Sequence, residues 1–360
     1  MFWLYFVVVI GASYGFAVFL GGPVVGSAIF GFAFLPLTVL VLFTLWLVSR
    51  AGLDFTNRLH ALTWGGLGAT TTTFLIVDLQ NSLFGSSTEM DSIVVQAAVV
   101  EEFAKGLFIF LMFFVYREVI RTPLTGAVFG VLVGAGFAYV ENMLYFNRAF
   151  NTGGWEPLLS TVWLRAGQSF FLHSLATMFT GLMVGYVVSR NLGRWKSAGF
   201  IMLGLLAAMT THGLWNGFSS LTTDGTNWYV LYFAFWLPYV AVMFTVLVVL
   251  RVLEWRKYRN LLEGLAEEGT ILWEDYAWFR SRKTRKALYR SSRSRDVIRW
   301  ERAAQLVPYW RTHATWLMGR FVLWKKRRVV GSEVQALKEA EYVTSHPLSG
   351  VSHQGLSTGS

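Results

Sequence analysis

The chain has 360 residues, of which 54% are hydrophobic and 14% are charged. This composition is typical of a polytopic membrane protein and excludes an ordinary soluble domain. The chain contains no cysteine, so disulfides and thiolate metal sites are excluded. The net charge of +10 arises after residue 250, because basic and acidic residues are equal in number before it.

Apolar stretches follow one another from the N-terminus. At about 20 apolar residues per crossing, they predict an all-α fold: a polytopic membrane helical bundle of about eight transmembrane helices, which fills residues 1–250. The spans are 3–20, 24–49, 61–80, 92–115, 124–146, 160–188, 198–220 and 228–250. The third is the weakest because Thr70–Thr73 and Asp78 interrupt it, and the sixth is long enough to be tilted or kinked. No charged signal-peptide region precedes the first span, so we expect that span to stay attached.

Lys and Arg alternate between the connecting loops. They follow spans two, four, six and eight, whereas Arg148 is the one basic residue in the other loops. The positive-inside rule therefore predicts a multi-pass protein of the cell membrane with both termini in the cytoplasm.

The region after residue 250 differs in composition from the spans. Residues 251–345 are predicted to form a basic, partly helical cytoplasmic tail, with amphipathic segments at 270–290 and 316–328. Such helices either lie on anionic lipids of the inner leaflet or pack on each other. Residues 346–360 are rich in Ser and Gly and are predicted to be disordered. No nucleic acid is expected as a partner, because the basic residues form no recognised motif.

The fourth span carries Glu101, Glu102 and Lys105 near its middle. A charge at bilayer depth costs roughly 2.5–3.5 kcal/mol on insertion scales, so three of them indicate a functional site. Lys105 lies one turn after Glu101 on the same helical face, and a pair between them would offset part of the burial cost. Glu102 points about 100° away, which predicts that it is the freer carboxylate.

Three further spans carry polar residues. Glu141 lies beside Asn142 in the fifth, His173 lies in the sixth, and His212 and Asn216 lie one turn apart in the seventh. At a rise of about 1.5 Å per residue, these positions and the glutamates of the fourth span fall at similar depths, roughly 8–20 Å below the outer surface. The topology therefore predicts that two His and three Glu converge in the outer half of the membrane. Arg165 is nearer the outer end and is predicted to snorkel outward.

These residue types suit a hydrolase. His173, His212 and Glu141 make a three-ligand metal site with an open position for water, and His and Glu ligands favour zinc. Glu101 or Glu102 is then the general base. Two polar residues complete the predicted catalytic set: Asn216 stabilises the oxyanion and Lys105 anchors the carboxylate pair. A metal-free version, a glutamate-based hydrolase, uses the same groups.

Other interpretations stay open. Buried His residues often make hydrogen bonds between helices, so a non-enzymatic membrane scaffold or immunity-type protein is an alternative. A proton-coupled transporter is less favoured, because no inverted pair of spans is visible. The motifs GxSG, HExxH and GxGD are absent, which disfavours serine, zincin-type and presenilin-type mechanisms. The Gly runs at 65–68 and 130–136 are predicted to allow close helix packing.

Four short motifs, each on its own span, resemble those of the PrsW family of intramembrane proteases. They are EEFAK at 101–105 for EExxK, FAYVEN at 137–142 for FxxxEN, HSLATMFTG at 173–181 for the third motif, and HGLWN at 212–216 for HGxxN. The resemblance covers a motif core of about residues 90–220. Glu141 stands where the related CAAX proteases carry a His, so a CAAX-type substrate is not implied.

The resemblance implies an intramembrane endopeptidase that acts on another membrane protein near the extracytoplasmic face. It further implies the first, site-1 cut of a single-pass anti-sigma factor in regulated intramembrane proteolysis. The resemblance does not extend to residues 221–360.

Overall fold

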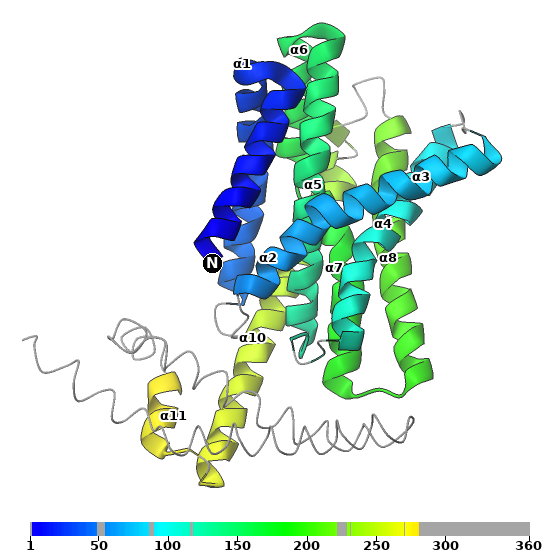
Figure 1. Ribbon diagram of the computed structural model, residues 1–360. Helices are drawn as coiled ribbons and strands as arrows, with labels where there is room; N and C mark the ends of the chain where they lie inside the picture. Colours follow the sequence, from blue (N-terminus) through cyan, green and yellow to red (C-terminus); the bar gives the residue numbers. More distant parts are fainter. Residues whose placement is uncertain are drawn as a thin grey trace, which may run out of the picture. The chain divides into compact units, whose positions relative to one another are not determined.

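The computed structural model describes residues 2–48, 55–85, 90–115, 117, 119–221, 229–230, 232–269 and 271–280. These residues are almost entirely helical and include no strand, which confirms the predicted all-α class (Figure 1). The chain divides into two compact units, Met1–Val248 and Val249–Ser360.

The first element, α1 (Phe2–Leu47), is a helical hairpin. Gly22 has φ 72° and ψ 177°, a conformation that an L-residue with a side chain rarely adopts, and the two arms run antiparallel on either side of it (Figure 1). A Cβ at Gly26 would meet the backbone of Ala17, so the arms touch near the turn. The hairpin supplies the first two predicted spans, and its turn falls in the loop between them.

A second helical segment consists of α2 (Phe55–Thr63), the π-helical η1 (Trp64–Ala69) and α3 (Thr70–Phe84). It corresponds to the predicted third span. The next helix, α4 (Met90–Val115), corresponds to the fourth.

The elements that follow correspond, in order, to the predicted fifth to eighth spans. They are α5 (Pro123–Gly153), α6 (Trp155–Val162), the π-helical η2 (Trp163–Gln168), α7 (Leu172–Arg190), α8 (Arg194–Leu221), the π-helical η3 (Tyr232–Trp236) and α10 (Leu237–Glu267). The predicted sixth span is kinked, because helical structure is interrupted between the end of η2 and the start of α7. The last helix continues past residue 250, where the eighth span was predicted to end.

Five helices of the described chain are long and apolar enough to cross a membrane. They are Val7–Leu47, Pro123–Gly153, Trp155–Arg190, Arg194–Ser219 and Tyr232–Glu267. The first contains two predicted spans, so this group accounts for six of the eight. These helices indicate a membrane-embedded protein. The helical segment 55–84 and the charged α4 are not among the five, and with them the predicted number of about eight transmembrane helices fits roughly.

Helix α5 lies at the centre of the first unit, where it packs on α7, α1 and η1. A Cβ at Gly126 would meet the Gly181 carbonyl of α7, and one at Gly134 would meet the carbonyl of His173. On another face, a Cβ at Gly136 would meet the carbonyl of Leu62 in α2. The prediction that the Gly runs allow close helix packing is therefore confirmed.

The second unit is described only over 249–269 and 271–280, which hold the end of α10 and the short α11 (Trp273–Arg280). Helix α11 falls within the first predicted amphipathic segment. The second segment, 316–328, the rest of the predicted tail and residues 346–360 lie outside the described residues.

Candidate active site

The charged residues of α4 form one buried cluster. The Lys105 Nζ atom donates hydrogen bonds to Glu102 Oε1 at 2.8 Å and to Glu101 Oε2 at 3.2 Å. The side chains of Lys105 and Glu102 are 0% exposed, and that of Glu101 is 11% exposed. The Lys105 ammonium also lies 3.9 Å from the centre of the Phe137 ring, a cation–π contact.

Glu102 is the more constrained carboxylate, so the prediction that it is the freer one is wrong. A lysine on a helix reaches carboxylates both three and four residues before it, and helical phase alone does not choose between them. Glu102 also accepts a hydrogen bond from Thr177 Oγ1 on α7 at 2.8 Å and lies 3.0 Å from His212 Nδ1 on α8. Its oxygens are thus held by three helices.

His173 stands on the first turn of α7, just after the kink. Its Nε2 lies 2.8 Å from Glu141 Oε2 on α5, and its Nδ1 lies 3.0 Å from Lys105 Nζ. A carboxylate accepts and an ammonium donates, so these contacts assign the ring hydrogen to Nε2. The lone pair of Nδ1 then points into the cluster, where Glu101 Oε2 lies 3.9 Å away.

His212 on α8 is oriented in the opposite sense. Its Nδ1 faces the Glu102 carboxylate, so the ring hydrogen is assigned to Nδ1 and the lone pair to Nε2. That Nε2 lies 3.8 Å from Glu101 Oε2. The two imidazole rings meet edge to face, with centroids 4.8 Å apart.

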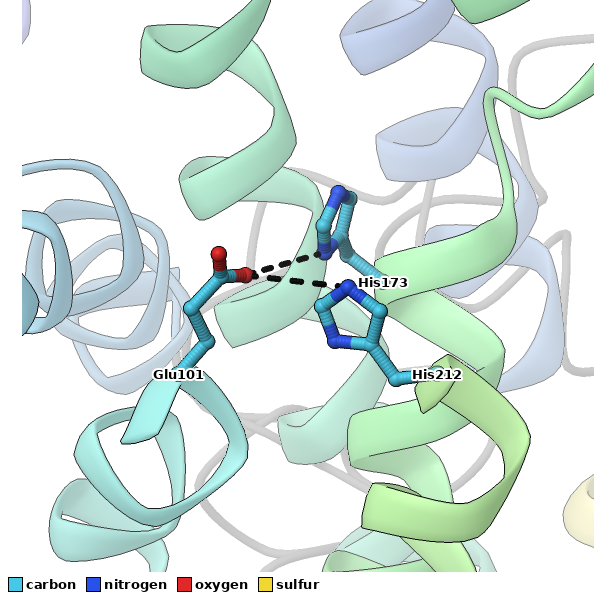
Figure 2. A group of neighbouring side chains, drawn as sticks. All are labelled: Glu101, His173 and His212. Atoms are coloured by element: carbon cyan, nitrogen blue, oxygen red, sulfur yellow. Dashed lines mark ion pairs between the residues drawn. The ribbon is translucent and has the colours of Figure 1, made fainter. Parts of the chain in front are cut away.

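Three possible ligand atoms therefore converge: Glu101 Oε2, His173 Nδ1 and His212 Nε2 (Figure 2). All three lie within 4.8 Å of one another. All three are electron-pair donors, and with the assigned tautomers neither ring hydrogen lies between them, so a cation suits the point where they meet. The Lys105 ammonium is one such cation, because it contacts Glu101 Oε2 and His173 Nδ1. Two imidazoles and one carboxylate are a ligand set of catalytic zinc sites. Each histidine also bonds a carboxylate through its other nitrogen, as metal-bound histidines do. The residues present thus fit a metal ion.

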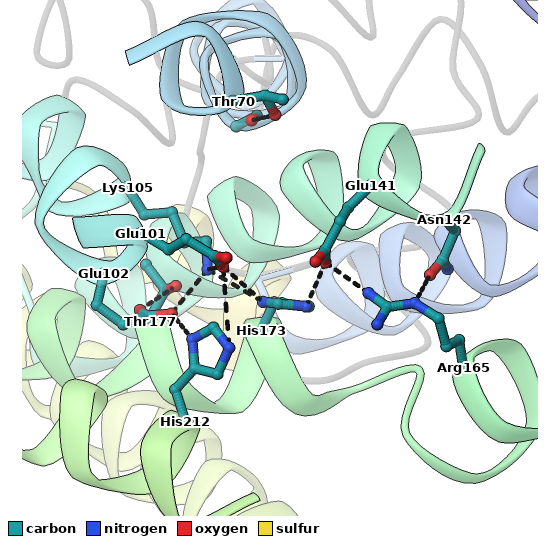
Figure 3. A network of polar contacts seen from close by, with 11 residues as sticks. Thr70, Glu101, Glu102, Lys105, Glu141, Asn142, Arg165, His173, Thr177 and His212 are labelled. Carbon is teal, nitrogen blue, oxygen red and sulfur yellow. Dashed lines mark hydrogen bonds and ion pairs between the residues drawn. The ribbon is translucent and has the colours of Figure 1, made fainter. Parts of the chain in front are cut away.

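Glu141 lies on the far side of His173 from this convergence. Its Oε2 accepts a hydrogen bond from Arg165 Nη2 at 2.6 Å, and Arg165 Nε donates to Asn142 Oδ1 at 2.9 Å (Figure 3). The Arg165 guanidinium carbon lies 4.0 Å from the centre of the Tyr145 ring. The prediction that Arg165 snorkels outward is therefore wrong, because two side chains of α5 hold it within the protein.

Asn216 lies one turn beyond His212 on α8 and is half-buried. The hydrogen bonds and ion pairs described above for the cluster do not include its side chain. The structure thus brings Glu101, Glu102, Lys105, Glu141, His173 and His212 together. Asn216 lies on α8, one turn from His212.

Sequence reasoning missed Thr177 and the inward role of Arg165. The sequence could have indicated Thr177, because it lies four residues after His173 and therefore shares its face of α7. The sequence could also have indicated Arg165, because a charged residue within an apolar span is by default a candidate functional residue.

A comparison with protein families matches residues 55–248 to the family described as PrsW family intramembrane metalloprotease. The matched stretch includes every element that contributes a side chain to the network. No curated protein and no solved structure matches the chain. The family match confirms the resemblance that the four motifs indicated. It also extends past the motif core of about residues 90–220 at both ends, so the prediction that the resemblance stops before residue 221 is wrong.

Proposed function

The chain belongs to the PrsW family of intramembrane metalloproteases, and from this premise we propose that Glu101, His173 and His212 form its metal-binding and catalytic centre. The observation that carries the proposal is the convergence of one carboxylate oxygen and two imidazole lone pairs within 4.8 Å. We propose zinc as the metal, because it prefers this mixture of nitrogen and oxygen ligands.

The geometry favours Glu101 over Glu141 as the third ligand. Glu141 bonds the nitrogen of His173 that faces away from His212, and it is already paired with Arg165. Glu101 Oε2 faces both histidines. We therefore propose that Glu141 and Glu102 orient the two histidines, each by accepting a hydrogen bond from the ring nitrogen that binds no metal.

When bound, the metal would supply a polarised water and stabilise charge on the scissile carbonyl oxygen. Glu101 is the proposed general base: its side chain is the more exposed of the pair, and its second oxygen points away from both histidines (Figure 2). It takes a proton from water as the water oxygen bonds to the carbonyl carbon, and it returns the proton to the amine that leaves. Lys105 balances the paired carboxylates. Asn216 is the proposed donor to the oxyanion.

A metal-free version of the same hydrolase has one observation in its favour. Lys105 Nζ already contacts two of the three converging atoms, Glu101 Oε2 and His173 Nδ1. In that version the Lys105 ammonium provides the positive charge, and Glu101 activates water with help from the histidines. The two versions differ in whether the active protein contains metal.

We propose that the substrate is a single-pass membrane protein, cut near the extracytoplasmic face, and that an anti-sigma factor is the natural target. The predicted depth of the polar residues in the outer half of the membrane and the family membership support this. From the same predicted topology we propose that both termini lie in the cytoplasm. The basic tail is proposed to lie on anionic lipids of the inner leaflet.

The test is cleavage of single-pass substrates by the full chain in reconstituted membranes. We expect Glu101→Gln to lower kcat by about 10²–10⁴-fold and Asn216→Ala by about 10²–10³-fold. Glu156→Gln removes an exposed carboxylate from α6 and serves as the matched control with wild-type activity. Full activity of Glu101→Gln would contradict the proposed mechanism.

A further inference from the structure

Arg165 stands apart from the four sequence motifs, yet it is tied to the site. It lies in η2, the π-helical turn between α6 and α7, and its side chain is 20% exposed. A π-helical turn changes the direction of side chains relative to an α-helix, and such turns occur frequently at functional sites. The turn places the guanidinium against α5, in the same network as His173 (Figure 3).

The Arg165 guanidinium uses two separate donors. Nη2 bonds Glu141 Oε2 at 2.6 Å, and Nε bonds Asn142 Oδ1 at 2.9 Å. The Asn142 amide, which is buried, thus fixes the plane of the guanidinium, and the Tyr145 ring lies against it at 4.0 Å. A lysine at this position would bring a point charge without the two-donor fork.

The oxygen that accepts from Arg165 is the same oxygen that bonds His173. Glu141 Oε2 lies 2.6 Å from Arg165 Nη2 and 2.8 Å from His173 Nε2. Whatever fixes this oxygen also fixes the ring of His173. The ring orientation in turn decides that Nδ1, and not Nε2, faces Glu101.

We propose that Arg165 is a positioning residue: it holds Glu141, and through Glu141 it orients the His173 imidazole toward Glu101 and His212. The inference rests on the proposed function of that convergence. It extends that function by one residue: Arg165 contacts Glu141, which in turn contacts His173. Arg165 lies in η2, which carries none of the four family motifs. Arg165 touches neither Glu101 nor His212 in the network, so its effect passes through Glu141.

The first test measures the environment of the His173 imidazole nitrogens by NMR. The imidazole ¹⁵N resonances of the full-length, chelator-treated protein are recorded in bilayers, with His173 assigned by its loss in His173→Gln. We expect Arg165→Gln to shift the His173 Nε2 resonance and Arg165→Lys to shift it less. Arg148→Gln removes an exposed arginine from α5 and is expected to leave the resonance in place. An unchanged His173 spectrum in Arg165→Gln would overturn the proposal.

A double-mutant comparison separates positioning from a general loss of packing. In a Glu141→Gln background, Arg165→Gln is expected to cause no further shift, because the route through Glu141 is already broken. A further shift of equal size would show that Arg165 acts on His173 by another route and would also overturn the proposal. If Arg165→Gln fails to fold, Arg165→Lys decides, since it keeps the charge and loses only the fork.

Zinc binding and turnover provide the link to function. Arg165→Gln is expected to raise the Kd for zinc by about 10-fold or more, and to lower kcat while KM for the substrate stays near its wild-type value. A wild-type protein that neither binds zinc nor cleaves would refute the proposed function. The ¹⁵N spectra would still decide the role of Arg165, so the two failures are distinguishable.

Discussion

Charged side chains in a membrane-embedded core are tolerated here because nearly every one has partners of opposite charge. Lys105 pairs with Glu101 and Glu102, and Arg165 pairs with Glu141. Three carboxylates therefore face one ammonium and one guanidinium, so acidic side chains outnumber these basic side chains by one. Burying an uncompensated charge is costly. A cation bound between Glu101, His173 and His212, as proposed above, would offset this imbalance.

The ion-pair arrangement makes a prediction about stability. Lys105→Met leaves two buried carboxylates without their ammonium partner, so we expect the free energy of unfolding to fall by about 3–5 kcal/mol. The double variant Lys105→Met/Glu102→Gln removes one of those charges and should recover part of the loss. Unfolding in detergent micelles measures both, with Lys196→Met, at an exposed position of α8, as the control.

One outcome for Lys105→Met would contradict this prediction. If Lys105→Met unfolded like the wild type, the contacts of its ammonium with Glu101 and Glu102 would contribute nothing to stability. The charge-balance argument would then be wrong.

The identities of the polar residues were visible in the sequence, but their pairings were not. Helical phase correctly placed Lys105 beside Glu101, and it failed to show that the same lysine also reaches Glu102. Likewise it gave no indication that Glu141 would face Arg165, because that pair joins α5 to η2. Contacts between helices depend on rotation about each helix axis, which one sequence does not specify.

At the scale of elements, glycines bring the site-bearing helices close enough to share hydrogen bonds. Gly126 and Gly130 of α5 lie against the backbone of α7, and Gly134 lies directly against the His173 carbonyl. Small residues at such crossings let membrane helices approach through van der Waals contact. The position of His173 relative to Glu141 therefore depends on the backbone contact at Gly134.

Gly134→Ala is predicted to push α7 away from α5 at the level of His173. Overpacking of this kind costs about 1–3 kcal/mol, and we expect a larger loss of proteolytic activity than of stability, because the histidine itself moves. Gly199→Ala in α8 is the matched control, since a Cβ there would meet open space. Activity and unfolding are measured side by side, and wild-type activity in Gly134→Ala would refute the positioning role of this contact.

The positions of the long helices could be predicted from the sequence better than the irregular turns within them. The sequence placed the turn between the arms of α1 and anticipated a bend in the long sixth span, both of which the structure has. It did not reveal the π-helical turns η1, η2 and η3. A single widened turn barely disturbs an apolar pattern, so periodicity does not detect it.

At the scale of the whole molecule, residues from 101 to 212 meet in one network through α4, α5, η2, α7 and α8. The sequence predicted this convergence from depth alone, because the spans alternate in direction. Depth does not fix which atoms face each other. Glu141 and Glu101 are predicted to lie at comparable depth, and the structure places them on opposite sides of His173.

The predicted topology is testable because the chain contains no cysteine. Single cysteines at two exposed positions, Asn151→Cys on α5 and Gly193→Cys between α7 and α8, report on opposite ends of the bundle. We expect an impermeant thiol reagent to label Asn151→Cys in intact cells and Gly193→Cys only after permeabilisation. The reverse pattern would invert the topology and place the site in the cytoplasmic half.

The most direct test of the central claim is the amount of metal bound per chain in the purified full-length protein and its variants. We expect bound zinc in the wild type, loss of zinc in Glu101→Gln and His212→Ala, weakened binding in Glu141→Gln, and full retention in the control Glu156→Gln. Zinc retained by Glu101→Gln and lost from Glu141→Gln would contradict the proposed ligand set. An active wild-type protein that contains no metal would contradict the metal centre itself and favour the version in which Lys105 supplies the charge.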